Sequence, residues 1–208
     1  NDGGNYEYSL GLNGLGLCST QYASEYMDVE SKRDGYVYTL HFEKGDNVGG
    51  LNIEDSTRKK TGTITRWLPD LDVFTDINIE KEYFQDILKK QSIVNAGLKL
   101  TFRNETNSGF ESEQYYYERG IEDYIAEIVG ESAMCSPVYW TDTRVGKDRD
   151  DKDSYKVKLS CCFTFSNSAT LLEYYHNSSF LEHGGAPDKA LKSAFVAEFD
   201  AYLKANGK

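Results

Sequence analysis

The sequence contains no long apolar run. No hydrophobic stretch approaches the length that a membrane-spanning helix needs, and the first residues, NDGGNYEY, are too polar for a signal peptide. We therefore expect no membrane association and a cytoplasmic location. Because the first residue is Asn rather than Met, we also expect the chain to be processed or to be part of a longer one.

Cysteine and histidine are scarce, and neither is arranged as a metal site. The three histidines show no ligand spacing, which argues against zinc. No Cys-x-x-Cys pair is present, so buried free thiols in a reducing compartment are favoured over a disulfide or a metal site. The four cysteines are Cys18, Cys135, Cys161 and Cys162.

Positive charge is also in short supply. The chain has 34 acidic and 23 basic side chains, for a formal net charge of −11. A net acidic surface repels the nucleic-acid backbone, whose neutralisation dominates nonspecific affinity. Strong nucleic-acid binding by this chain alone is not expected, whereas a local basic lining within a larger assembly stays open.

The hydrophobic pattern predicts strands with a few packed helices, which is an α+β fold. A helix is expected over residues 14–26, a second from a cap at Asp76 or Asn78 to about residue 94, a short third from Ile121, and a last one from Pro187. Trp67 and Trp140 are expected in the core. Strands are expected at 36–45, 62–69, 98–104, 112–118, 136–145 and 155–165. The buried face of the last helix is expected to comprise Leu191, Ala194, Phe195, Phe199, Tyr202 and Leu203.

The glycine-rich stretch YEYSLGLNGLGLC, residues 6–18, precedes the first expected helix. Glycine lets backbone N–H groups approach an anion, and the positive end of the following helix favours negative charge. The stretch is not a P-loop, because no Lys-Ser or Lys-Thr follows the glycines. By itself it fits either a phosphate cradle or a plain loop before a helix.

Several further stretches occur in the order of one known family. GLNGLGLCSTQYASEYMDV resembles the ATP-lid and helix segment of the GHKL ATPases, specifically the B subunits of bacterial type II topoisomerases (DNA gyrase and topoisomerase IV). In this resemblance Asn13 replaces the family's His and Leu10 replaces its first Gly. The stretches KKTGTITRWLPDLDVFTD, IVNAGLKLTFRN, YYYERGIEDYI and HNSSFLEHGGAPDKALKSAFVAEFDAY extend it over nearly the whole chain.

The resemblance implies two domains: residues 1–31 as the end of the ATP-binding (Bergerat) domain with its lid, and residues 32–208 as a transducer domain like the second domain of ribosomal protein S5. It places Tyr6 at the adenine. Lys192 would line a DNA cavity, although a solvated lysine beside an apolar stripe is an equal alternative. The implied phosphate-binding residues are Gly11, Leu12, Asn13, Gly14, Leu15 and Gly16.

The resemblance further implies a parent protein that uses ATP and Mg²⁺, acts on DNA with the topoisomerase's A subunit, and dimerises through the ATPase domain. The family's catalytic Glu, Mg²⁺-binding Asn and Asp-x-Gly-x-Gly motif lie before the lid, and its Gln-Thr-Lys loop lies after the last helix. None is in this sequence. We therefore expect no bound cofactor and no ATP hydrolysis from this chain alone.

Three other interpretations remain open at this point. A divergent paralogue with HGGAP at 183–187, in place of the family's Gly-Gly-Thr-His corner, would be a non-catalytic interaction or DNA-clamp module. A sensor-kinase ATPase shares the GLGL box but not the long strand-rich body. A mismatch-repair-type relative shares the transducer fold but not KTGT…WLPD.

Overall fold

The computed structural model describes residues 15–57, 59–147 and 149–207. The chain divides into two compact units, Asn1–Ile79 (unit 1) and Glu80–Lys208 (unit 2), which are described separately. Both combine helices with antiparallel strands, so the α+β prediction is confirmed. Within the described ranges no helix is long and apolar enough to cross a membrane.

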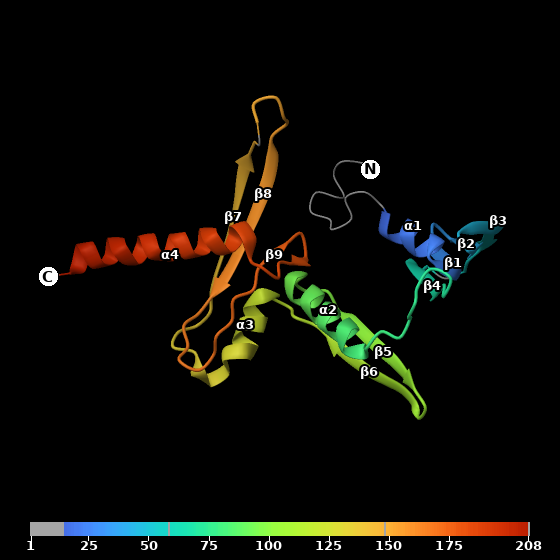
Figure 1. Ribbon diagram of the computed structural model, residues 1–208, viewed down its shortest axis with the longest axis horizontal. Helices are drawn as coiled ribbons and strands as arrows, with labels where there is room; N and C mark the ends of the chain where they lie inside the picture. The colour runs from blue at the N-terminus through green and yellow to red at the C-terminus, as the bar shows by residue number, and fades with distance from the viewer. Residues whose placement is uncertain (1–14, 58, 148, 208) are drawn as a thin grey trace. The chain divides into compact units, whose positions relative to one another are not determined.

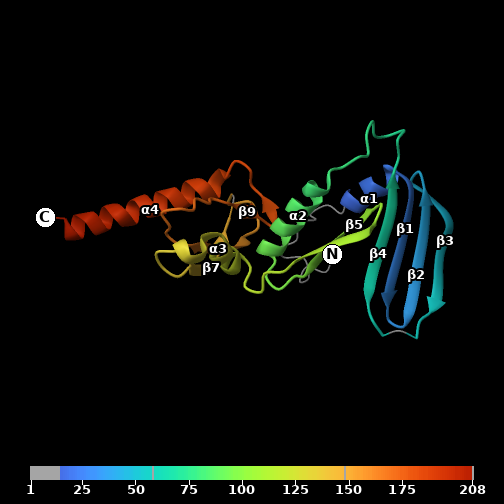
Figure 2. The same ribbon diagram turned by 90° about the horizontal axis from the view of Figure 1, so that it is seen from below.

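Unit 1 is one helix beside a four-stranded antiparallel sheet in the order β3-β2-β1-β4 (Figure 2). In this order β3 and β4 are the two edge strands of the sheet. The buried side chain at its centre is Met27, only 1% exposed. The elements are α1 (Leu15–Tyr22), β1 (Ser24–Arg33), β2 (Tyr36–Glu43), β3 (Asp46–Asp55) and β4 (Gly62–Pro69).

Two features of unit 1 differ from the sequence prediction. The first helix ends at Tyr22 instead of residue 26, because residues from Ser24 onward pair with both β2 and β4. Strand β3 was not predicted: Gly49 and Gly50 both have positive φ, and the β2–β3 register shifts between Thr39 and His41, so the alternating pattern is broken.

Unit 2 contains three helices and three two-stranded antiparallel sheets among its described residues (Figure 1). The expected strands at 98–104, 112–118, 136–145 and 155–165 are confirmed as two hairpins. The elements are α2 (Lys81–Val94), β5 (Leu100–Thr106), β6 (Gly109–Tyr115), α3 (Ile121–Val129), a 3₁₀ turn (Gly130–Ser132), β7 (Val138–Gly146), β8 (Tyr155–Phe163), β9 (Tyr175–His176), β10 (Ser179–Phe180) and α4 (Gly185–Asn206).

The core of unit 2 lies where α2 meets the β5–β6 hairpin and α3. Ile93 of α2 is 2% exposed and Tyr117 is 9% exposed. The rings of Phe84 and Phe102 stack at 6.1 Å between α2 and β5. Gly120 has room only for hydrogen, because a Cβ there would lie 2.8 Å from the Ile93 carbonyl oxygen.

Three sequence predictions about packing are wrong. The last helix is not buried along its stripe: Leu191 and Phe195 are half-buried, and the other four residues are exposed. Trp67 on β4 and Trp140 on β7 are about half exposed. Helix α2 begins at Lys81 without a side-chain cap, since the Asp76 carboxylate accepts the N–H of Asn78 in a local turn.

The cysteine prediction holds in part. All four thiols are free, but Cys18 and Cys135 are exposed, and Cys161 and Cys162 are half-buried on β8. Burial raises the pKa of the Cys161 thiol, which keeps it protonated and inert at neutral pH.

Candidate functional site

The predicted nucleotide-binding residues fall at the start of unit 1. Tyr6, Gly11, Leu12, Asn13 and Gly14 lie outside the described residues. Leu15 and Gly16 form the first turn of α1, and Leu15 is exposed.

Helix α1 begins with a turn suited to an anion. Its first turn carries no acidic residue, and the N–H groups of a first helical turn carry partial positive charge. The hydroxyls of Ser19 and Thr20 donate to the carbonyls of Leu15 and Gly16, at 2.8 and 3.0 Å. These two bonds occupy carbonyls and use none of the N–H groups of the first turn.

The other end of α1 is fastened to the sheet. The Ala23 carbonyl accepts the backbone N–H of Asp70 at 3.0 Å, which joins the helix end to the residue that follows β4. Gln21 Nε2 donates to the Gly45 carbonyl at 2.7 Å, in the β2–β3 turn. The stretch STQYAS at the end of α1 and the stretch KTGTITRWLPD therefore meet in space, although Ala23 and Asp70 are 47 positions apart along the chain.

Asp70 also organises the charges at this junction. It is 6% exposed, and its Oδ1 accepts the N–H of Asp72 at 2.8 Å. Lys44 Nζ lies 3.4 Å from Asp70 and 2.5 Å from Asp72. The hydrogen bond from Lys44 holds the pKa of Asp72 below its usual value, and the same bond raises the pKa of Lys44. Both groups are therefore charged at neutral pH.

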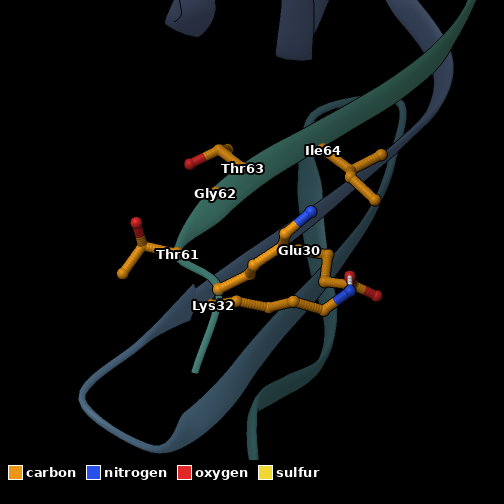
Figure 3. Close-up of a pocket in the computed structure, with 7 residues that line it drawn as sticks. Glu30, Lys32, Thr61, Gly62, Thr63 and Ile64 are labelled. Atoms are coloured by element: carbon orange, nitrogen blue, oxygen red, sulfur yellow. Dashed lines mark ion pairs between the residues drawn. The ribbon is translucent and has the colours of Figure 1, made fainter. Parts of the chain in front are cut away.

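A depression of about 240 Å³ lies where β4 begins beside β1 (Figure 3). Its walls carry two lysines and two threonine hydroxyls. Lys32 pairs with Glu30 at 2.6 Å, as the dashed line in Figure 3 marks. The KTGT stretch carries part of the family resemblance, but the sequence predicted no site residue in it. The lining residues are Glu30, Lys32, Lys60, Thr61, Gly62, Thr63 and Ile64.

A second depression, of about 410 Å³, on the same sheet includes His41. His41 Nδ1 lies 2.7 Å from Asp28 Oδ1, and its Nε2 lies 3.4 Å from Glu43 Oε1. Hydrogen bonding to Asp28, and then to Glu43, raises the pKa of His41. Despite this trio, no group of His, Cys, Asp and Glu in the described part of the chain has the arrangement of a metal site.

The predicted DNA-binding residue, Lys192, lies in unit 2 on the exposed side of α4. Its Nζ is 2.9 Å from the Asp188 carboxylate, one turn earlier in the same helix. The ion pair holds the lysine against the helix and offsets its charge toward a phosphate. Lys192 belongs to unit 2, whereas the other predicted site residues belong to unit 1.

The chain is similar to a well-defined group of proteins. The profile of the family described as DNA gyrase B matches residues 120–208. The chain is 26% identical to the DNA topoisomerase 4 B subunit of Enterococcus faecalis over 98% of its length and 29% of the relative's. It is 28% identical to the DNA gyrase B subunit of Synechocystis over 99% of its length and 19% of the relative's.

Solved structures show the same fold. The 43K ATPase domain of Thermus thermophilus gyrase B, solved with an aminocoumarin, superposes with a TM-score of 0.72 at 24% identity, covering 94% of this chain and 51% of that one. The ATP-binding domain of Francisella tularensis topoisomerase IV gives 0.69 at 25% identity, covering 95% and 51%. The chain thus spans less than a third of the curated relatives and about half of these solved domains.

Proposed function

We propose that this chain, which is similar to the B subunits of DNA gyrase and topoisomerase IV, serves an ATP-dependent type II topoisomerase. Its role there is to couple nucleotide binding at the lid to movement of the clamp that holds DNA. The complete enzyme would work in the cytoplasm with ATP and Mg²⁺, with the A subunit of the topoisomerase and with DNA, and would dimerise through its ATPase domain. The relatives named above all support a role in a topoisomerase, and none supports a non-catalytic module.

The observation that carries this proposal is the junction between Ala23 and Asp70. The lid-like stretch and the KTGT…WLPD stretch resemble separate parts of the family's sequence, and the structure joins them by a backbone hydrogen bond and a buried carboxylate. A helix held so firmly at one end transmits a displacement of its other end to the sheet. Binding of an anion at Leu15 and Gly16 would therefore displace the end of β4.

The residue roles are part of the same proposal. Tyr6 would contact the adenine, and Lys192 would line the DNA cavity. The phosphate-binding residues would be Gly11, Leu12, Asn13, Gly14, Leu15 and Gly16, through backbone N–H groups at the start of α1. We assign no catalytic residue to this chain, so hydrolysis would depend on groups supplied by the rest of the enzyme.

The domain division is also proposed. The sequence places residues 1–31 with the ATP-binding domain and residues 32–208 with the transducer. Position 32 lies inside β1, and unit 1 continues to Ile79. We therefore propose that the boundary lies between Ile79 and Glu80, with the whole sheet belonging to the ATP-binding side.

A chimaera tests the function. The chain replaces the matching segment of the Enterococcus faecalis topoisomerase 4 B subunit, which it matches over 98% of its own length. We expect this chimaera, combined with the A subunit of that enzyme, to relax supercoiled DNA in an ATP-dependent reaction. A matched pair of variants, Gly16→Val at the start of α1 and Gly35→Val in the β1–β2 turn, separates lid function from general damage. If only Gly16→Val abolishes ATP-dependent relaxation, the proposal is supported. A folded chimaera that never relaxes DNA refutes it.

A further inference from the structure

The three consecutive residues Glu173, Tyr174 and Tyr175 face two different helices. Tyr124 of α3 donates its hydroxyl to Glu173 Oε1 at 3.2 Å. Tyr175 donates to Glu173 Oε2 at 2.7 Å. Both carboxylate oxygens of Glu173 are therefore occupied, and the start of the β9–β10 hairpin is held to α3 by charge-assisted bonds.

The tip of the same hairpin is held to α2. Gln91 Nε2 donates to the Ser178 carbonyl at 2.8 Å, and the Ser178 hydroxyl donates to Asn95 Oδ1 at 3.3 Å. The ammonium group of Lys90 lies 4.2 Å from the centre of the Phe180 ring. The hairpin thus has polar attachments to α2 along its length as well as to α3 at its base.

The side that faces α4 is bonded less well. The Tyr174 hydroxyl is sealed from solvent and has no hydrogen-bond partner of ordinary geometry among the described residues. Asp188, in the first turn of α4, is the carboxylate beside it. Burial, and then a weak hydrogen bond to the Asp188 carboxylate, raise the pKa of Tyr174. A buried hydroxyl without a partner weakens the attachment it occupies.

The backbone between the hairpin and α4 is built to turn. Gly184 and Gly185 are consecutive residues with φ of 68° and 65°, a conformation that L side chains rarely adopt. A Cβ at Gly184 would lie 2.7 Å from Asp188 Cβ and 3.3 Å from the Tyr174 ring. Figures 1 and 2 both place the start of α4 beside β9.

Beyond this point, α4 has little to hold it. Phe195 meets the Phe163 ring of β8 at 5.2 Å, an apolar contact without directional bonds. Further along the helix, Phe199, Tyr202 and Leu203 are exposed by 54%, 65% and 64%. The attachments of α4 are thus apolar contacts and one poorly bonded hydroxyl, whereas the hairpin is held by charge-assisted bonds.

We propose that residues 173–185 form a one-sided joint, in which the β9–β10 hairpin is fixed to α2 and α3 while α4 pivots about Gly184 and Gly185. This inference rests on the proposed function only for the use of the movement, which would be clamp motion. The asymmetry itself belongs to unit 2 and needs no nucleotide. Its tests on the chain as it stands are therefore independent of the chimaera.

Two neighbouring tyrosines give a matched pair of variants, since each loses one hydroxyl. Amide hydrogen exchange is followed at Leu181, whose N–H donates to the Tyr174 carbonyl at 2.8 Å within the hairpin. Tyr175→Phe removes a bond to a carboxylate and is expected to speed this exchange roughly tenfold or more. Tyr174→Phe removes a hydroxyl that has no bond of ordinary geometry, and is expected to change it by less than about twofold. Equal acceleration by both variants, or none by either, overturns the proposal.

A second measurement needs no destabilising variant. Spin labels are attached through non-natural amino acids, because the four native thiols would react with cysteine labels. One label is placed at position 82 in α2 and its partner at position 176 in the hairpin or position 201 in α4, all on exposed residues. The 82–176 distance distribution is expected to be narrow and the 82–201 distribution broad. Two equally narrow distributions would show that α4 is fixed, and the pivot would be wrong.

Discussion

Replacing Ile93 by Ala tests where unit 2 keeps its core. The side chain is 2% exposed, and the backbone at Gly120 approaches it so closely that the neighbourhood has little freedom to collapse. Removing three buried carbons from such a site costs the lost transfer free energy and leaves a cavity. We expect the free energy of unfolding to fall by about 3 kcal/mol, which corresponds to a melting temperature roughly 10 °C lower.

Phe199→Ala is the matched control. It removes a larger apolar group than Ile93→Ala, but the Phe199 ring is 54% exposed on α4. We expect a loss of less than about 1 kcal/mol. Urea unfolding followed by circular dichroism measures both variants, with the slope m checked for constancy.

The order of the two effects is decisive. The sequence pattern alone predicts the opposite, because it makes Phe199 part of a buried stripe. If Phe199→Ala costs more than Ile93→Ala, then α4 is packed in solution and the description of an uncovered helix is wrong. The pivot proposed for α4 would fall with it.

Three further predictions concern unit 1 and the isolated chain. The pKa of His41 is raised in the folded state, so its stabilising contribution is present below its ordinary pKa of 6.5 and is lost as pH rises through the folded value. Unit 1 should therefore melt at a lower temperature at pH 8 than at pH 6. In a pH series of thermal melts, His41→Gln should flatten that dependence. Gly45→Ala should destabilise unit 1 by more than the roughly 1 kcal/mol expected for Gly35→Ala. Both glycines have positive φ, but only at Gly45 would a Cβ overlap the Tyr22 ring. Equal losses of stability in urea unfolding would contradict the packing of α1 on the β2–β3 turn. The purified chain should release no phosphate from ATP, and its DNA binding by fluorescence anisotropy should be weak and vanish between about 50 and 200 mM salt; robust turnover would refute the view that the hydrolytic groups lie elsewhere.

Local patterns in this sequence predicted elements well wherever the alternation was unbroken. YVYTLHFE, GTITRWLP and the two hairpins of unit 2 all form strands where expected, because β-branched and aromatic residues alternate with polar ones. Strand β3 was missed because two glycines interrupt it. The helix predicted over residues 14–26 was too long, because residues from Ser24 onward form a strand by pairing with β2 and β4. Pairing between strands that are distant in sequence leaves no local pattern.

Burial was harder to predict than secondary structure. A stripe of apolar residues shows that a helix has a face to bury, but it does not show whether a neighbouring element reaches it. Phe199 and Tyr202 fit the pattern and remain exposed. Ile93 was not singled out, since it lies at the end of α2 and is buried by the chain that returns through Tyr117 and Gly120.

The candidate site was predictable as a resemblance and only in part as geometry. Leu15 and Gly16 were named, and they do begin a helix whose first turn carries no acidic residue. The Ala23–Asp70 junction was not foreseen, because its two halves are distant in sequence and a backbone bond leaves no pattern of residue types. Lys60 and the two threonines of KTGT, which line the depression beside β1, could have been singled out from their polar character beside a strand start.

The order of the strands in unit 1 has a practical consequence for handling the purified chain. At one side of the sheet, β3 is bent by the glycine pair and its register shift, which discourages addition of another strand. At the other side, β4 runs regularly through GTITRWLP with a single charged side chain, and no described strand pairs with its far edge. Molecules of the isolated chain will therefore tend to associate along β4, and a lysine at Thr65 would improve their solubility at high concentration.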